Sequence, residues 1–252
     1  MSFQRVLLPL QVNLFDTLGH SVHWENRPKG VKIAVISRID ADGHIPIVRT
    51  TSKYDMPAQH FAPIHKEIVQ HIKTVSGING LQLNHATCEI YDYQYRTMKY
   101  HTDQALDIAP SSYICLFSCY EYEREAHLRY LKIKSKETNE ESVIELSHNS
   151  CVLFSDAVNQ AHVHKIEALG SGSTAGGRWM GLTFRLSKTF VEFTDGVPRL
   201  VGKDVELRMA SEEQQRKFYR LKGMENSSMD HTYLDIEYTI SKSDLMPLGP
   251  SP

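Results

Sequence analysis

The sequence predicts a mainly β protein with flanking helices. From residue 81 to about residue 198, short apolar stretches recur at close intervals and turn residues separate them. No helical pattern alternates with these stretches, which excludes the β-α repeat of a parallel sheet. Short strands joined by turns are typical of a double-stranded β-helix, the jelly-roll or cupin-like core. The expected strands are Cys88–Tyr93, Tyr113–Tyr120, Ala126–Ile133, Ser142–Leu146, Cys151–Phe154, Ala161–Glu167 and Arg178–Leu186.

Length and composition indicate one compact domain. The chain has 252 residues, 41% of them hydrophobic and 23% charged, which supplies enough apolar material for a core. Lys and Arg number 28 against 30 Asp and Glu, so no basic excess points to a nucleic-acid backbone as the main partner. No apolar run reaches the length of a membrane span, and Val6–Val12 reads as an edge strand. The four cysteines form no CxxC pair and are expected to be reduced, buried thiols of a soluble intracellular protein, cytoplasmic or nuclear.

Residues 1–80 are expected to pack on the core as a hairpin and a scaffold helix. The hairpin would join Val31–Ile36 to Ile45–Val48 through the turn residues 40–43, Asp-Ala-Asp-Gly. The helix would begin at Pro63, bury isoleucines spaced four residues apart, and end at Gly77. Its two histidines, at positions 65 and 71, are expected to face solvent.

Residues 81–198 are expected to form the catalytic core, and residues 199–252 a C-terminal extension. Ser211 begins a capping box, which predicts a helix to about Leu221 with Gly223 as its stop. A strand over Tyr233–Ile240 and a loose tail would follow. The glycine- and serine-rich segment 168–177 is no phosphate loop, because no Gly-Lys-Ser/Thr follows it; it reads as a mobile connection beside the site.

Two histidines and one aspartate suggest a metal site in the core. His101 and Asp103 are two residues apart, so on a strand they share a face, and His164 follows Asp103 by 61 residues, enough for several strands to bring it back. Two imidazoles and one carboxylate form the facial triad that binds Fe(II) and leaves positions open. His162 competes with His164, since it would point the same way. With 13 histidines in the chain, each of these could also be an ordinary core or surface residue.

Arg178 and Arg185 bracket one apolar strand, where an unpaired arginine is costly. Either a structural anion or the carboxylate of a bound ligand would satisfy them. The two arginines are seven positions apart, so a regular strand sends them to opposite faces, and we hypothesise that a bulge at Gly181 restores a common face.

Over about residues 45–187 the chain resembles the AlkB-type Fe(II)/2-oxoglutarate dioxygenases. Tyr100-His-Thr-Asp103 followed by Ala109-Pro-Ser-Ser-Tyr-Ile114 resembles that family's His-x-Asp and the strand after it. Asn159-Gln-Ala-His-Val-His164 is similar to the run that ends in its second iron histidine, and Leu182-Thr-Phe-Arg185 to the end of its oxoglutarate strand. Ile90-Tyr-Asp-Tyr93 resembles its Asn-x-Tyr element, although Tyr91 stands in place of the asparagine.

The resemblance implies a role for each of these positions. His101, Asp103 and His164 would bind Fe(II), which favours His164 over His162. Arg178 would hold the distal carboxylate of 2-oxoglutarate, Arg185 the end near the metal, and Tyr93 would donate its hydroxyl. The strand carries one extra residue relative to the family and has Gly181 where the family has asparagine, so the assignment of the two arginines stays open.

The sequence therefore predicts a dioxygenase that uses Fe(II), 2-oxoglutarate and O2 to oxidise a substrate C–H bond. The neutral charge favours a small-molecule, amino-acid-like or peptidyl substrate. The alternative is oxidative N-demethylation of DNA or RNA, which requires a basic, aromatic-bearing groove. Its candidates lie in the N-terminal hairpin: Trp24, Arg27, Lys29, Lys32 and Arg38. A third alternative is a jelly-roll binding protein without catalysis.

Overall fold

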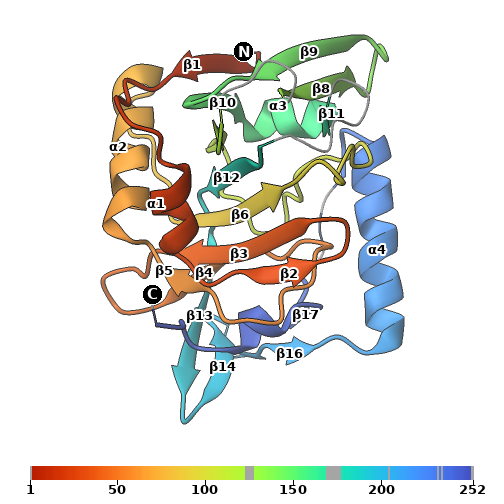
Figure 1. Cartoon of the computed structure of the whole chain (residues 1–252). Coiled ribbons are helices and arrows are strands. Elements are labelled where there is room, and N and C mark those ends of the chain that lie inside the picture. Colours follow the sequence, from red (N-terminus) through yellow and green to blue (C-terminus); the bar gives the residue numbers. More distant parts are fainter. Residues whose placement is uncertain are drawn as a thin grey trace.

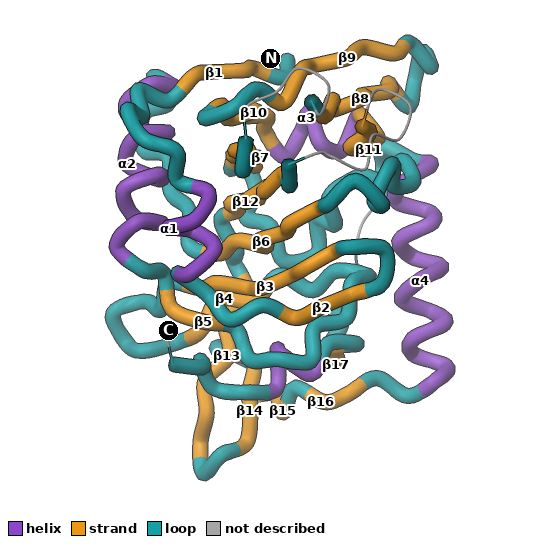
Figure 2. Tube along the Cα trace, in the orientation of Figure 1, coloured by secondary structure: helices purple, strands orange, loops and turns teal. Residues whose placement is uncertain are grey.

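The computed structural model describes residues 2–122, 128–168, 177–203, 205–231, 233 and 235–250. Its largest sheet has eight strands in the order β1-β10-β7-β12-β6-β3-β2, with β5 beside β3 (Figures 1 and 2). All pairs along this order are antiparallel. The strands are β1 (Gln4–Leu7), β2 (Glu25–Arg27), β3 (Val31–Ser37), β5 (Gln59–His60), β6 (His85–Tyr91), β7 (Tyr113–Tyr120), β10 (Ser150–Ser155) and β12 (Trp179–Arg185).

A second antiparallel sheet packs against the inner face of the first. It comprises β8 (Arg129–Ser135), β9 (Glu141–Leu146) and β11 (His162–Ala168), in the order β11-β8-β9. One apolar cluster takes side chains from both sheets, for example Leu116 and Phe154 from the large sheet and Leu131 and Ile166 from the small one. Burying both inner faces in this way removes apolar surface from water and holds the two sheets together. The jelly-roll class expected from the sequence is confirmed.

Helices cover the outer face of the large sheet. They are α1 (Phe15–His20) and α2 (Pro63–Ser76), which bury a second apolar cluster against the sheet. As predicted, α2 begins at Pro63 and ends at Gly77, which adopts φ +66°. The prediction that His65 faces solvent is wrong: it is 1% exposed. Its Nδ1 accepts the backbone N–H of Ala62 at 2.9 Å, so the imidazole caps the helix from inside.

The expected hairpin between β3 and β4 (Ile45–Ile47) does not form. Both strands exist, but β4 pairs with β13 (Thr189–Thr194) in a separate sheet, of order β15-β14-β13-β4. The other two strands of that sheet are β14 (Val197–Leu200) and β15 (Val205–Glu206). The turn residues reverse the chain, but a strand from a distant part of the sequence supplies the pairing.

The C-terminal extension contains α4 (Glu212–Ser227), on the side of the molecule opposite α1 and α2 (Figure 1). Ser211 caps it as predicted, but the helix runs through Gly223 instead of ending there. Phe218 is fully buried in a small apolar cluster with Leu106 of the core. Within the described residues of the expected strand over 233–240, β17 (Tyr238–Thr239) is the part that forms, and it pairs with β16 (Arg208–Met209). A 3₁₀ helix, Lys242–Leu245, follows.

The sequence also predicted reduced, buried cysteines and a mobile connection between β11 and β12. The four cysteines are free and buried, as expected. Most of the glycine-rich segment, residues 169–176, lies outside the described residues. Within the described parts of the chain, no helix combines the length and apolar character needed to cross a membrane.

Candidate metal centre

His101 and His164 lie directly opposite each other. His164 belongs to β11, and His101 lies in the connection between β6 and β7. Their backbones exchange two hydrogen bonds, from His101 N to His164 O at 2.9 Å and from His164 N to His101 O at 2.7 Å. The ring centroids are 4.7 Å apart. This bridge fixes both imidazoles on one side of the small sheet.

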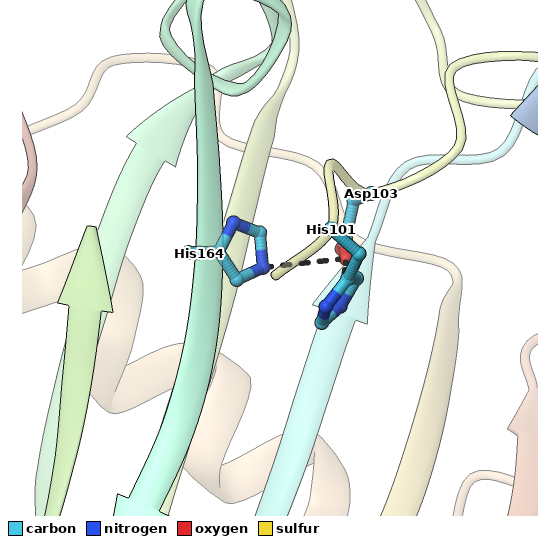
Figure 3. Close-up of side chains that lie close together, drawn as sticks. All are labelled: His101, Asp103 and His164. Carbon is cyan, nitrogen blue, oxygen red and sulfur yellow. Dashed lines mark ion pairs between the residues drawn. The ribbon is translucent and has the colours of Figure 1, made fainter. Parts of the chain in front are cut away.

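Asp103 completes the group. Its Oδ1 lies 3.7 Å from His101 Nε2 and 3.6 Å from His164 Nε2, and Figure 3 shows the three side chains turned toward one another. All three ligand atoms lie within 4.8 Å of one another. Asn159 holds the aspartate backbone from both sides, because its Oδ1 accepts from Asp103 N and its Nδ2 donates to Asp103 O, at 2.9 and 2.7 Å. Asn159 lies in the short helix α3 (Asp156–Ala161), which the sequence did not predict.

The two oxygens of Asp103 face different partners. Oδ2 accepts from Nε of Arg185 at 2.8 Å and lies 2.7 Å from its Nη2, while Nη1 of the arginine donates to Thr87 at 3.0 Å. Burial raises the pKa of Asp103, but the charge of Arg185 and then His164 outweigh burial, and the pKa lies well below its usual value. Burial, with the charge of His164, lowers the pKa of His101 to about 3. The centre therefore presents an ionised carboxylate and a neutral His101 at neutral pH, the forms that bind a metal ion.

The three side chains line a cavity of about 310 Å³ between the two sheets. One wall is apolar and comprises Leu116, Leu131, Phe154 and Ile166. Hydroxyl-bearing residues of the segment 50–54, together with Tyr91, Tyr95 and Lys99, line other parts of it. A concave pocket that combines an apolar wall with convergent polar groups is the usual form of a small-molecule site.

The sequence did not point to Glu89, which also lines this cavity. It lies on β6 in register with Gly181, two residues beyond Thr87, on the face that turns inward. Burial raises the pKa of its carboxyl, the hydroxyl of Tyr91 opposes the rise by hydrogen bonding, and no Lys, Arg or His of the described chain forms an ion pair with it. A single acidic residue inside a strand of otherwise uncharged, buried residues was the available sequence signal.

Arg178 lies outside the cavity. The pairing of β12 with β6 and β7 is continuous from Trp179 to Arg185, so the hypothesised bulge at Gly181 is absent. Arg178 forms an ion pair with Glu121 at 2.9 Å and packs over the ring of Phe15 on the helix-covered side. The inward position at this end of the strand belongs to Trp179, which is 1% exposed and stacks on Tyr91.

Tyr93 is also not brought to the site. Strand β6 ends at Tyr91, so alternation stops before residue 93, and the Tyr93 side chain is 42% exposed. Tyr91 and Tyr95 take the inward positions instead. Of the two competing histidines, His162 contacts Val158 O and the ring of Phe3, so His164 alone joins the cluster.

The fold and this donor set define a jelly-roll protein in which two histidines and one carboxylate are placed to hold one metal ion. The sequence model of the 2OG-Fe(II) oxygenase superfamily matches residues 11–185. The chain belongs to this superfamily, which confirms at that level the resemblance to AlkB-type enzymes seen in the sequence. Fe(II), 2-oxoglutarate and O2 are therefore its cofactors, and the described donor set fits the iron.

Two solved structures are similar to the chain. The structure of OsALKBH1 aligns with a TM-score of 0.48 at 12% identity and covers 73% of this chain and 97% of that one. A prolyl-4-hydroxylase from Pseudomonas putida aligns with a TM-score of 0.42 at 13% identity and covers 73% and 93%. The search of curated proteins gave no match.

Proposed function

We propose that this chain is an Fe(II)/2-oxoglutarate-dependent dioxygenase that oxidises a C–H bond of a small-molecule, amino-acid-like or peptidyl substrate. The observation that carries the proposal is the convergence of His101, Asp103 and His164 on the lining of one cavity. These three residues would be the iron ligands. With 2-oxoglutarate and O2 bound, the iron supplies the oxidising chemistry.

The protein's own residues would hold and orient the reactants. Asp103 offers Oδ1 to the metal while Arg185 keeps Oδ2, so one carboxylate is oriented and charged at once. Because Arg178 lies on the other face, we propose that donors lining the cavity, such as Tyr95 and Lys99, meet the carboxylates of 2-oxoglutarate. The apolar wall would exclude water from the reacting C–H bond.

The carboxyl of Glu89 supports a substrate that brings a positive charge or an N–H donor into the cavity. A buried carboxylate without an ion-pair partner is costly until a ligand supplies one. Amines, guanidines and amides have the required groups. The four buried thiols support an intracellular location.

The alternative, nucleic-acid binding in a groove near the N-terminal residues 24–38, has less support than a small substrate in the cavity. Trp24 packs against the apolar cluster under α1 and α2, away from the cavity, and donates its indole N–H to Gly19 O at 2.8 Å. Arg27 is held by Glu25 at 2.7 Å and Asp55 at 3.3 Å. These two side chains are therefore engaged within the protein.

The metal centre is tested by adding Fe(II) and 2-oxoglutarate without oxygen and recording the weak visible charge-transfer band. We expect the band in the wild-type protein and in Asp16→Ala, which changes an exposed aspartate of α1 and serves as a matched control. We expect no band in Asp103→Ala. A wild-type protein that binds iron without the band, or a band that survives in Asp103→Ala, would contradict the assignment.

The substrate class is tested by succinate release with panels of amines, amino acids, peptides and methylated oligonucleotides. The proposal expects stimulation by an N–H-bearing small molecule or peptide, and loss of that preference in Glu89→Gln. Stimulation by methylated oligonucleotides alone, abolished when Lys29, Lys32 and Arg38 are neutralised, would establish the N-demethylase alternative instead.

A further inference from the structure

The backbone that carries His101 and Asp103 is held by hydrogen bonds from three directions. His101 uses its N–H and C=O with His164 of β11, and Asp103 uses both of its groups with Asn159 of α3. Between them, Thr102 is fully buried, and its N–H and C=O turn the other way, toward α4. Buried backbone groups need partners, so α4 is part of what fixes this segment.

Helix α4 supplies these partners through three consecutive contacts. Asn226 Oδ1 accepts the N–H of Thr102 at 2.9 Å, and Lys222 Nζ donates to the C=O of the same residue. Glu225 Oε1 accepts the N–H of Ala105 at 2.8 Å. Lys222 lies three residues before Glu225 and four before Asn226, so the three side chains share one face of the helix.

The charges in this contact balance within the C-terminal extension. Glu225 is 3% exposed, and its Oε2 accepts from Tyr233 OH at 2.6 Å and lies 3.3 Å from Lys222 Nζ. Lys136 of the small sheet donates to the C=O of Glu225 at 2.7 Å. The carboxylate that holds Ala105 is thus itself held from two sides, and Lys222 also lines the cavity.

We propose that α4 is a clamp on the metal-binding segment 101–105, with Asn226 and Glu225 as positioning residues for the iron ligands. The helix lies beyond the region matched to the superfamily, residues 11–185, so the clamp is a property of this chain's own extension. The inference rests on the proposed metal centre. It predicts that the extension sets metal affinity without touching the metal.

The reasoning is that two of the three ligands sit on a segment without regular secondary structure of its own. His101 is anchored through its bridge to β11, but Asp103 must reach Oδ1 toward both imidazoles while Oδ2 stays on Arg185. Releasing Thr102 and Ala105 would let the segment rotate about these anchors. Partners that orient metal ligands from outside typically account for roughly 10–100-fold in metal affinity.

The test uses Co(II), a stable substitute for Fe(II), titrated into the full-length protein while its visible ligand-field bands are recorded. Asn226→Ala removes the acceptor for Thr102, and Asn226→Asp keeps it. Ser227→Asp, at the exposed neighbouring position, adds the same charge without the bond. Glu225→Ala removes the acceptor for Ala105 and is paired with Glu213→Ala, at an exposed glutamate of the same helix. Hydrogen exchange over residues 99–106 is measured on each metal-free protein, with circular dichroism as the check of folding.

We expect Asn226→Ala and Glu225→Ala to bind Co(II) roughly 10–100-fold more weakly, with altered bands and faster exchange at 99–106. Asn226→Asp should restore affinity, while Ser227→Asp and Glu213→Ala should match the wild type. Folded Asn226→Ala with a dissociation constant within twofold of wild type would overturn the clamp alone. A wild-type protein with no affinity for Co(II) would overturn the metal centre as well.

Discussion

The pair formed by Asp103 and Arg185 gives the sharpest test of how the centre is built. Both residues are 6% exposed, and two guanidinium nitrogens lie 2.7 and 2.8 Å from Oδ2. Arg185→Met replaces the aliphatic stem of arginine with an unbranched side chain of similar length and removes the charged guanidinium group. It leaves a buried carboxylate without its strongest partner, which costs about 3–5 kcal/mol when a buried pair is broken.

A loss of that size is visible in thermal unfolding of the metal-free protein. For a chain of this length, each kcal/mol lowers the Tm by about 2–4 °C, so Arg185→Met should unfold roughly 6–20 °C below wild type. Arg208→Met is the control, since Arg208 pairs with Glu206 at 2.8 Å on the surface and is 72% exposed. Exposed pairs contribute about 0–1 kcal/mol, so the control should unfold close to wild type.

The double variant Arg185→Met/Asp103→Asn completes the cycle. Removing both charges leaves no unpaired ion, so the double variant should be more stable than the sum of the single losses predicts, by roughly 1–3 kcal/mol. Additive losses, or an Arg185→Met protein that unfolds within about 2 °C of wild type, would refute the reasoning, because either result means that the pair is not coupled in the folded state.

Three further predictions concern stability. Burial raises the pKa of Glu89, so the ionised form of this residue disfavours folding. Glu89→Gln should therefore have a higher Tm than the wild type at pH 8, and the difference should disappear toward pH 5. A difference that grows at acidic pH would contradict this. A Cβ on Gly181 would lie 2.1 Å from the Trp179 ring, so Gly181→Ala should lower the free energy of unfolding, measured with denaturant, by at least about 1–3 kcal/mol. Gly223 lies within a helix and has open space around it, so Gly223→Ala should raise the free energy of unfolding by about 0.5–1 kcal/mol. Burial raises the pKa of Asp244 to about 6, so the wild-type protein loses stability as the pH rises from 4 through 6. Asp244→Asn should therefore equal the wild type in stability at pH 4 and exceed it above pH 6, by at most about 3 kcal/mol. Calorimetry at a series of pH values measures this difference.

The local elements of the fold were predictable because they depend on short-range pattern. β7 has the predicted bounds, Tyr113–Tyr120, and α2 begins at Pro63 and ends at its glycine stop. The assignment of His101, Asp103 and His164 to one metal site remains a proposal, but the structure brings all three together. Spacing alone could not decide whether His162 or His164 is the second histidine of the site. His162 contacts Val158 O in a helix that the sequence did not predict, and this contact turns it away from the cluster.

Other residues depended on pairing across long sequence distances. Arg178, directly before β12, and Arg185, at its end, could not be assigned from spacing. A bulge at Gly181 would have changed the face on which Arg178 lies. The register of β12 with β6 and β7 is continuous, and this excludes the bulge. Tyr93 missed the cavity because its strand ends two residues earlier. β4 left its expected hairpin because β13, more than a hundred residues later, supplies its partner.

The sequence by itself determined the strand and helix propensities and the mainly β class, since these follow from residue type and periodicity within short windows. Tertiary structure alone decided which side chains face the cavity. It placed Glu89 and Lys222 there and turned Arg178 away. It also extended α4 through Gly223, because Glu225 and Asn226 find partners on the metal-binding segment more than a hundred residues earlier. Such contacts override local stop signals, because hydrogen bonds to buried backbone groups outweigh the about 1 kcal/mol penalty of a glycine within a helix.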